Sequence, residues 1–178
     1  ISQEGGHNLN SKVTRFRVAD DLKPGQTRTV SSGGKNIIEV KEYLESVKRG
    51  INPYFTTNTL TYLARGGRVT KIASIFGNVL SIKPILRLDF DGHLLVHTKG
   101  HGKTNTYKKM LEAIKEQVEN PENQTLYVSH SNAIESAVEF AEMVKKELGF
   151  KDIFYSYIGS IIGSHTGPGL IAVFFYGK

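Results

Sequence analysis

Apolar residues recur along the chain in two patterns, one typical of helices and one typical of strands. Helical spacing predicts helices in five ranges: 36–50, 59–67, 71–80, 104–118 and 132–148. Short apolar or alternating runs predict strands at 53–57, 82–90, 93–98, 124–129, 151–157 and 170–176. The last run is apolar almost throughout, which is typical of a strand buried on both faces.

Turn and capping residues set the expected element boundaries. Asp91-Gly92 between two strands predicts a hairpin. Thr104 or Asn105 is the expected cap of one helix, and Asn132 with Glu135 forms the expected capping pair of the next. The buried face of the first of these helices is expected to carry Tyr107, Met110 or Leu111, Ile114 and Val118.

The order strand, helix, strand over 124–157 predicts a right-handed crossover within a mixed sheet. The expected fold is therefore α/β, a two-layer mixed β-sheet with helices. Residues 1–36 are poor in periodicity, with one short alternating run at 13–18, and rich in Gly, Ser, Asn and Thr, so they are expected to form an irregular N-terminal segment or linker. The globular domain is expected to span 37–178.

Composition excludes several classes of protein. The chain has 178 residues and no cysteine, which excludes disulfides and thiol catalysis. No apolar run is long enough for a membrane span, and the first residues do not form a secretory signal, so a cytoplasmic location is expected. The net charge is +6, but the basic residues are dispersed and partly paired with acids, so nucleic acid is not an expected partner.

His93, His97 and His101 are spaced four apart, which on a helix would suggest a metal site. On the predicted strand, residues four apart lie about 13 Å from each other, too far to share one ion. No metal or other cofactor is expected.

His165 and Thr166 lie between glycines and Pro168, directly before the final strand. The glycines allow positive φ and Pro168 restricts the backbone, so a stiff turn is expected to aim His165 at the mouth of a buried strand. An imidazole and a hydroxyl can together donate hydrogen bonds to a carboxylate or phosphate. A hydrogen-bonded turn histidine without a ligand is the alternative interpretation.

Arg65 and Arg68 flank a double glycine, which suits an anion or the acidic surface of a partner; helix capping with solvated arginines is the alternative.

The predicted helix 71–80 leads into a strand and has one apolar face. Such a helix is part of a solid core or lines an apolar tunnel. The chain contains no GxxxxGK[ST], GxSxG or HExxH motif, so no catalytic site of its own is expected.

Four stretches, in order, resemble the DegV family of bacterial fatty-acid-binding proteins. They are TLTYLARGGRVTKIASIFGNVLSIKPIL (59–86), the Asp91-Gly92 turn with the helix that follows it, YVSH (127–130) and IGSIIGSHTGPGLIAVFFYG (158–177). The resemblance covers residues 37 to the end. The family's N-terminal parallel-sheet lobe has no counterpart here, so the chain is expected to be a truncated relative or a portion of a longer protein.

The resemblance implies that a long-chain fatty acid lies in an apolar tunnel and that its carboxylate is presented to a separate ATP-dependent kinase subunit, which forms an acyl phosphate. By position, His165 corresponds to the family's carboxylate-contacting histidine, and Arg65 and Arg68 are expected to face the phosphate or the kinase. The other expected ligand-binding residues are Thr166, Ile72, Ile75, Phe76, Leu80, Ile82, Ile161 and Ile162.

Two other hypotheses stay open. A small-anion or nucleotide-binding module would use Arg65, Arg68 and His165 without a tunnel. A purely structural interaction domain would bind neither class of ligand.

Overall fold

The computed structural model of the chain describes residues 37–67 and 82–178. The chain divides between Arg49 and Gly50, and Gly50–Lys178 forms the larger compact unit. Helix α1 (Ile37–Val47) belongs to the first unit, and the 3-10 helix η1 (Lys48–Gly50) follows it. The predicted helix at 36–50 is confirmed, but Val40 is its one buried residue and Ile37, Ile38, Tyr43 and Leu44 are exposed.

A six-stranded mixed sheet forms the centre of the larger unit, with strand order β3-β2-β1-β6-β4-β5. The strands are β1 (Ile51–Thr56), β2 (Ile82–Leu88), β3 (Leu94–His101), β4 (Thr125–Ser131), β5 (Asp152–Tyr157) and β6 (Leu170–Tyr176). Neighbouring strands are antiparallel except β4 and β5, which are parallel and joined by helix α5. The expected strand–helix–strand crossover in a mixed sheet is therefore present.

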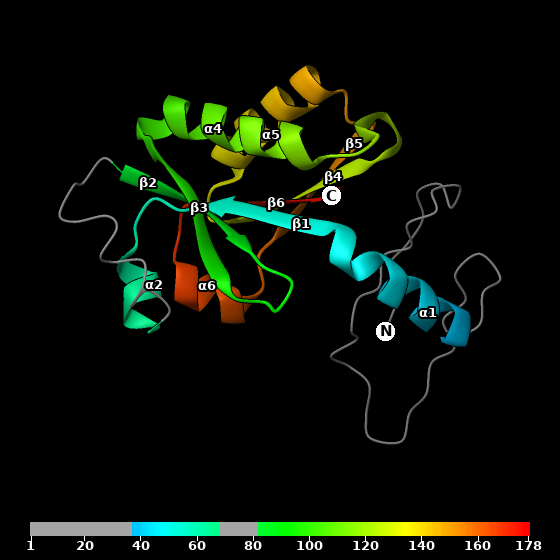
Figure 1. Ribbon diagram of the computed structural model, residues 1–178. Helices are drawn as coiled ribbons and strands as arrows, with labels where there is room; N and C mark the ends of the chain where they lie inside the picture. The colour runs from blue at the N-terminus through cyan, green and yellow to red at the C-terminus, as the bar shows by residue number, and fades with distance from the viewer. Residues whose placement is uncertain (1–36, 68–81) are drawn as a thin grey trace. The chain divides into compact units, whose positions relative to one another are not determined.

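Helices lie on both sides of this sheet. They are α2 (Thr61–Arg65), α4 (Gly102–Gln117), α5 (Ile134–Leu148) and α6 (Ser160–Thr166), with the short 3-10 helix η2 (Pro121–Asn123) before β4. Figure 1 shows α4 and α5 along one face of the sheet and α2 and α6 on the opposite side, where they contact each other.

The main core fills the space between the sheet and helices α4 and α5. Strand residues whose side chains point to this face alternate along β4, β6 and β1, as the pleat requires. The buried set includes Tyr54, Ile85, Leu126, Val128, Ile171, Val173 and Phe175 from the strands, with Tyr107, Met110, Ile114, Phe140 and Val144 from the helices. Of the two alternatives for α4, Met110 is in the core and Leu111 packs at its edge.

The described residues cover the opposite face of the sheet only partly. A small cluster there has Leu63 of α2 and Leu86 of β2 at its centre, with half-buried apolar side chains around them. Towards β4 and β5 the side chains on this face remain half-buried. The sheet therefore has one filled face and one apolar face that the described helices leave partly open.

Both expected helix caps differ from those observed. Helix α4 begins at Gly102 with His101 as N-cap, and Asn105 lies inside the first turn, where its Oδ1 accepts a hydrogen bond from the His101 backbone N–H. Helix α5 begins after Ala133, and Asn132 has a left-handed backbone (φ 46°) that keeps it outside the helix. No side chain of the described residues caps α5, and the N–H of its N-cap residue Ala133 donates to His130 Nδ1 of β4 at 3.3 Å.

The hairpin of β2 and β3 is confirmed, although β3 extends three residues further than expected, to His101. The expected helix at 71–80 lies outside the described residues. So does the expected irregular segment 1–36, and the domain boundary at residue 37 stays a prediction.

Candidate functional site

The segment that carries His165 is helical, not the turn that its glycines suggested. Helix α6 runs from Ser160 to Thr166, and His165 lies half-buried in its last turn. Gly163 has helical geometry, whereas Gly167 (φ 73°) and Gly169 (φ 88°) have the positive φ that glycine favours. The stiff turn therefore begins one residue after Thr166 and ends α6 before β6.

This turn packs closely on the segment from Asn58 to Gly66, which includes α2. A β-carbon at Gly66 would lie 2.5 Å from Nδ1 of His165. In the same way, a β-carbon at Gly167 would overlap the Tyr62 ring, and one at Gly169 would overlap the Asn58 side chain. At each of these three glycines, the missing side chain leaves the space that a side chain of the facing segment occupies.

Two threonines, Thr57 and Thr166, form hydrogen bonds beside the contact between α6 and α2. The hydroxyl of Thr57, which is almost fully buried, lies 3.3 Å from the carbonyl oxygen of Thr166. Thr166 is 4% exposed, and its hydroxyl donates to the Ile162 carbonyl at 2.9 Å. The Thr166 hydroxyl proton therefore points to a carbonyl of α6. A hydrogen bond from Thr166 to a ligand would require this hydroxyl to rotate, and it stays a prediction.

The apolar residues expected around the ligand divide into three groups. Ile161 and Ile162 are on α6 and are 78% and 53% exposed. Ile82 is half-buried beside the Leu63 and Leu86 cluster, and its contact with a ligand stays a prediction. The remaining predicted residues, Ile72, Ile75, Phe76 and Leu80, lie outside the described residues.

Arg65 ends helix α2 and is exposed, as expected. Its guanidinium lies 6.0 Å from the centre of the Tyr62 ring, at the limit of a cation–π contact. Arg68 lies outside the described residues.

An open groove of about 650 Å³ borders the packed turn. The segments that line it are the end of β1 with α2, the start of α5, and Pro168-Gly169. Its polar residues Asn58, Asn132 and Ser136 were missed by the sequence reasoning, because none belongs to a catalytic motif. Asn58 directly precedes one family-like stretch and Asn132 lies two residues after another, and this proximity was the signal that could have found them.

A small cavity of about 40 Å³ adjoins the groove and contains two lysines, Lys83 and Lys103. Burial lowers the pKa of Lys83, and the charge of Lys103 lowers it further. Lys83 donates a hydrogen bond to Asn58 Oδ1, and Lys103 pairs with Glu139. Thr56 also lines this cavity, and among the described residues its buried hydroxyl has no hydrogen-bond partner.

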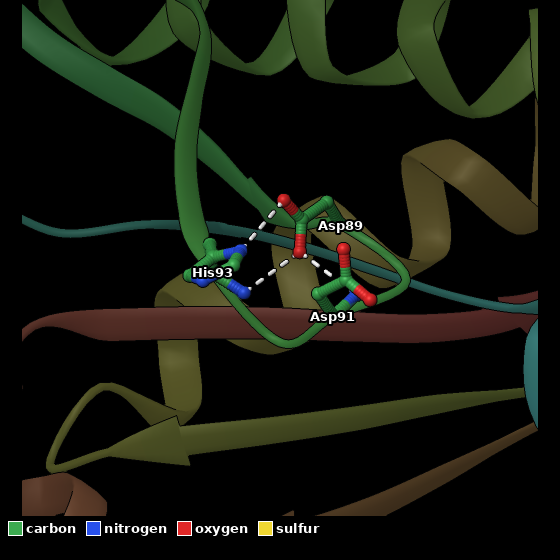
Figure 2. Close-up of polar contacts among 3 residues, drawn as sticks. All are labelled: Asp89, Asp91 and His93. Atoms are coloured by element: carbon green, nitrogen blue, oxygen red, sulfur yellow. Dashed lines mark hydrogen bonds and ion pairs between the residues drawn. The ribbon is translucent and has the colours of Figure 1, made fainter.

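The hairpin between β2 and β3 brings Asp89, Asp91 and His93 together, as Figure 2 shows. Asp89 Oδ1 accepts backbone hydrogen bonds from His93 at 2.8 Å and Asp91 at 3.0 Å, and Oδ2 lies 3.1 Å from His93 Nδ1. Both Asp89 oxygens are thus occupied within the turn. We therefore interpret these contacts as hydrogen bonds that stabilise the hairpin turn. His97 and His101 are elsewhere: His97 packs edge-on to Tyr54, and His101 begins α4.

Fold and site together define an α/β lobe whose polar edge, where glycines allow close packing, adjoins an apolar sheet face that the described helices leave partly open. Comparison with known proteins gives the family. The DegV family profile, described as "Uncharacterised protein, DegV family", matches residues 26–178. The chain belongs to the DegV family.

Relatives and solved structures agree with this assignment. A DegV domain-containing protein of Clostridium perfringens is 40% identical over 81% of this chain and 50% of its own length. A DegV-family structure from Ruminococcus gnavus, refined with vaccenic acid, superposes with a TM-score of 0.72 at 27% identity, over 80% of this chain and 50% of that one. A fatty acid binding DegV family protein from Streptococcus agalactiae gives a TM-score of 0.67 at 27% identity, over 82% of this chain and 51% of that one.

The chain spans about half the length of the curated relatives it matches. In the two described stretches, 37–67 and 82–178, no helix combines the length and apolarity that crossing a membrane requires.

Proposed function

We propose that this chain is the acyl-binding lobe of a fatty-acid-binding protein, and that it presents a lipid carboxylate to a separate kinase subunit for acyl phosphate formation. The observation that carries the proposal is the apolar face of the sheet next to α6, which the described helices leave partly open. This face combines half-buried apolar side chains with a polar edge, which is what an amphiphile with one charged end requires. The likeness to DegV structures that bind fatty acids supports the same ligand class.

Energetics favour an acyl chain on such a face. Each methylene removed from water contributes about 0.8 kcal/mol, so a long chain gains on the order of 10 kcal/mol before ordering costs. A carboxylate cannot follow the chain into an apolar site without a donor. His165 is the donor we assign, because it lies at the edge of this face and not in the core.

The kinase step is the finer part of the proposal. It is supported by the DegV resemblance and by the absence of any catalytic motif in the sequence. Arg65, exposed at the end of α2, and Arg68 three residues later are the residues we assign to the phosphate or to the kinase surface.

The test is extraction of the purified protein, expressed from its complete reading frame, followed by mass spectrometry of the extract. We expect fatty acid in near-stoichiometric amount. Delipidated protein should then rebind fatty acid and support its phosphorylation by a kinase subunit with ATP. A protein that neither retains nor rebinds fatty acid would contradict the proposal.

One observation favours the small-anion alternative. The cavity with Lys83, Lys103 and the unpartnered Thr56 hydroxyl has the donors that a small oxyanion would need. Under that alternative, phosphate or a nucleotide would raise the unfolding temperature of delipidated protein, whereas fatty acid would not.

A further inference from the structure

The open face of the sheet is not uniformly apolar but has a row of small side chains across three adjacent strands. Ser129 of β4 is paired with Ala172 of β6 on one side and with Ser156 of β5 on the other. The core-facing neighbours Val128 and Val173 point to α4 and α5, so these three point to the open face. We call Ala172, Ser129 and Ser156 the small row.

The two hydroxyls of the small row share one hydrogen bond, in which one is the donor and the other the acceptor. Ser129 Oγ and Ser156 Oγ lie 2.8 Å apart, within hydrogen-bond distance. Two hydroxyls on an apolar face would otherwise require a polar partner from a ligand. Because they pair together, this row is compatible with an apolar chain lying on it.

The next row along the same strands consists of three aromatic rings. Tyr127 is paired with Phe174 on β6 and with Phe154 on β5, and all three are half-buried. The Tyr127 and Phe154 rings pack edge to face with centres 5.8 Å apart. We call these residues the aromatic row. Since alternate residues on a strand are about 7 Å apart, the aromatic row stands directly beside the small row.

Helix α6 lies at the other side of the small row. A β-carbon at Gly163 would be 4.0 Å from Ser131 Oγ, which places α6 over the end of β4. From the His165 end, the order along β4 is therefore Ser131, then Ser129, then Tyr127. The small row therefore lies between α6 on one side and the aromatic row on the other, with Ser129 and Ser156 half-buried and Ala172 buried.

We propose that the small row is the floor on which the acyl chain lies and that the aromatic row limits the length of chain the protein accepts. This inference rests on the proposed fatty acid function. Small side chains leave room for methylenes, whereas a half-buried ring fills that room and is held in place by its neighbours. A chain that reaches the rings must turn or stop.

The test measures which chain lengths the protein selects. The complete protein is delipidated, exposed to an equimolar mixture of saturated fatty acids of increasing length, re-isolated and extracted. Phe154→Ala removes one ring of the aromatic row, and Tyr127→Leu reduces another. Each should shift the bound distribution to longer acids, by about tenfold in relative affinity for every two methylenes newly accommodated.

A larger side chain in the small row should have the opposite effect. Ser156→Leu places a branched side chain in the small row on an edge strand, and we expect the distribution to shift to shorter acids. Ser156→Ala removes the hydroxyl without filling the space, so its distribution should match that of the natural protein. Ile153→Ala is the control for loss of apolar volume, because Ile153 is on the same strand but packs towards the main core.

The possible outcomes distinguish failure of the chain-length inference from failure of the proposed fatty acid binding. If the natural protein retains fatty acid and the variants fold, as judged by their unfolding temperature, but their distributions are unchanged, the aromatic row does not limit chain length. A shift in Ile153→Ala equal to that in Phe154→Ala would also overturn the inference. If the natural protein binds no fatty acid of any length, the proposed function itself fails.

Discussion

A β-carbon placed on Gly66 would lie only 2.5 Å from Nδ1 of His165, so the absence of a side chain at Gly66 determines where the imidazole can lie. The two residues are almost one hundred positions apart in the sequence and come from α6 and the end of α2. Their contact links the residue we assign to the carboxylate with the helix that carries Arg65.

Gly66→Ala should therefore displace His165 while leaving the fold intact. The Gly66 backbone has φ −74°, which alanine adopts without strain. We expect a loss of fatty acid affinity with a change in unfolding temperature of only a few degrees, because only one half-buried ring must move. In a His165→Ala background the same substitution should have no further effect on affinity, a coupling that a double-mutant cycle measures. Additive losses would mean that Gly66 acts elsewhere.

His165→Ala should weaken fatty acid binding about ten- to a hundredfold, because a hydrogen bond to a charged group contributes about 1–3 kcal/mol. Stability should change little, since His165 is half-buried at the surface of α6. The measurement is fatty acid affinity by calorimetry beside thermal unfolding of the same samples. Unchanged affinity with a large loss of stability would instead identify a structural histidine, the alternative that the sequence left open.

Arg65→Ala should leave fatty acid retention unchanged and reduce phosphorylation of bound lipid by a kinase subunit. The side chain is exposed, and its nearest described aromatic contact is a distant one with Tyr62. Arg65→Lys keeps the positive charge but lacks the planar guanidinium with its paired N–H donors, so we expect phosphorylation of bound lipid to be only partly reduced. Arg68→Ala is the companion variant. Loss of lipid with kinase association intact would reverse the roles assigned here.

Asp89 should make folding stability depend on pH in the acid range. The backbone N–H of His93 holds the pKa of Asp89 below its usual value, and the His93 ring and the Asp91 N–H act in the same direction. Because the folded pKa is depressed, the stabilisation is complete above the ordinary aspartate pKa of about 4 and is lost as the pH falls through the folded value.

The measurement is the urea midpoint of the natural protein and of Asp89→Asn between about pH 6 and about pH 2. The natural protein should be the more stable at the upper end, and the difference should shrink as the pH falls. Asp91→Asn is the matched control, because Asp91 contributes its backbone N–H, which asparagine retains. A difference that stays constant with pH would show that the Asp89 charge does not stabilise the turn.

Periodicity and turn residues alone determined most of the elements and their order. Helix α5 and strand β6 follow from local rules, the first from its apolar face and the left-handed Gly149 at its end, the second from an apolar run after Pro168 and Gly169. The hairpin at Asp91-Gly92 follows from turn chemistry. These features depend on residues near each other in the chain, which is why a sequence pattern can predict them.

Helix boundaries were the local features that the sequence did not predict. Asn105 and Asn132 look like caps, but one hydrogen-bonds back to His101 from inside α4, and the other takes a left-handed conformation so that Ala133 can bond His130 of β4. His165 likewise lies in a helix although glycines surround it. In each case a contact made by the folded chain outweighs the intrinsic preference of one residue.

Only the tertiary structure decided which residues meet. Helix packing between distant segments brings Gly66 to His165 and Gly167 to Tyr62. Strand register aligns the small row and the aromatic row. Register depends on the pairing of whole strands, because a shift by one residue would exchange the two faces of the sheet. The sequence could therefore indicate a histidine with a possible ligand role, while the fold alone determined the helix against which it packs and the rows of small and aromatic residues beside it.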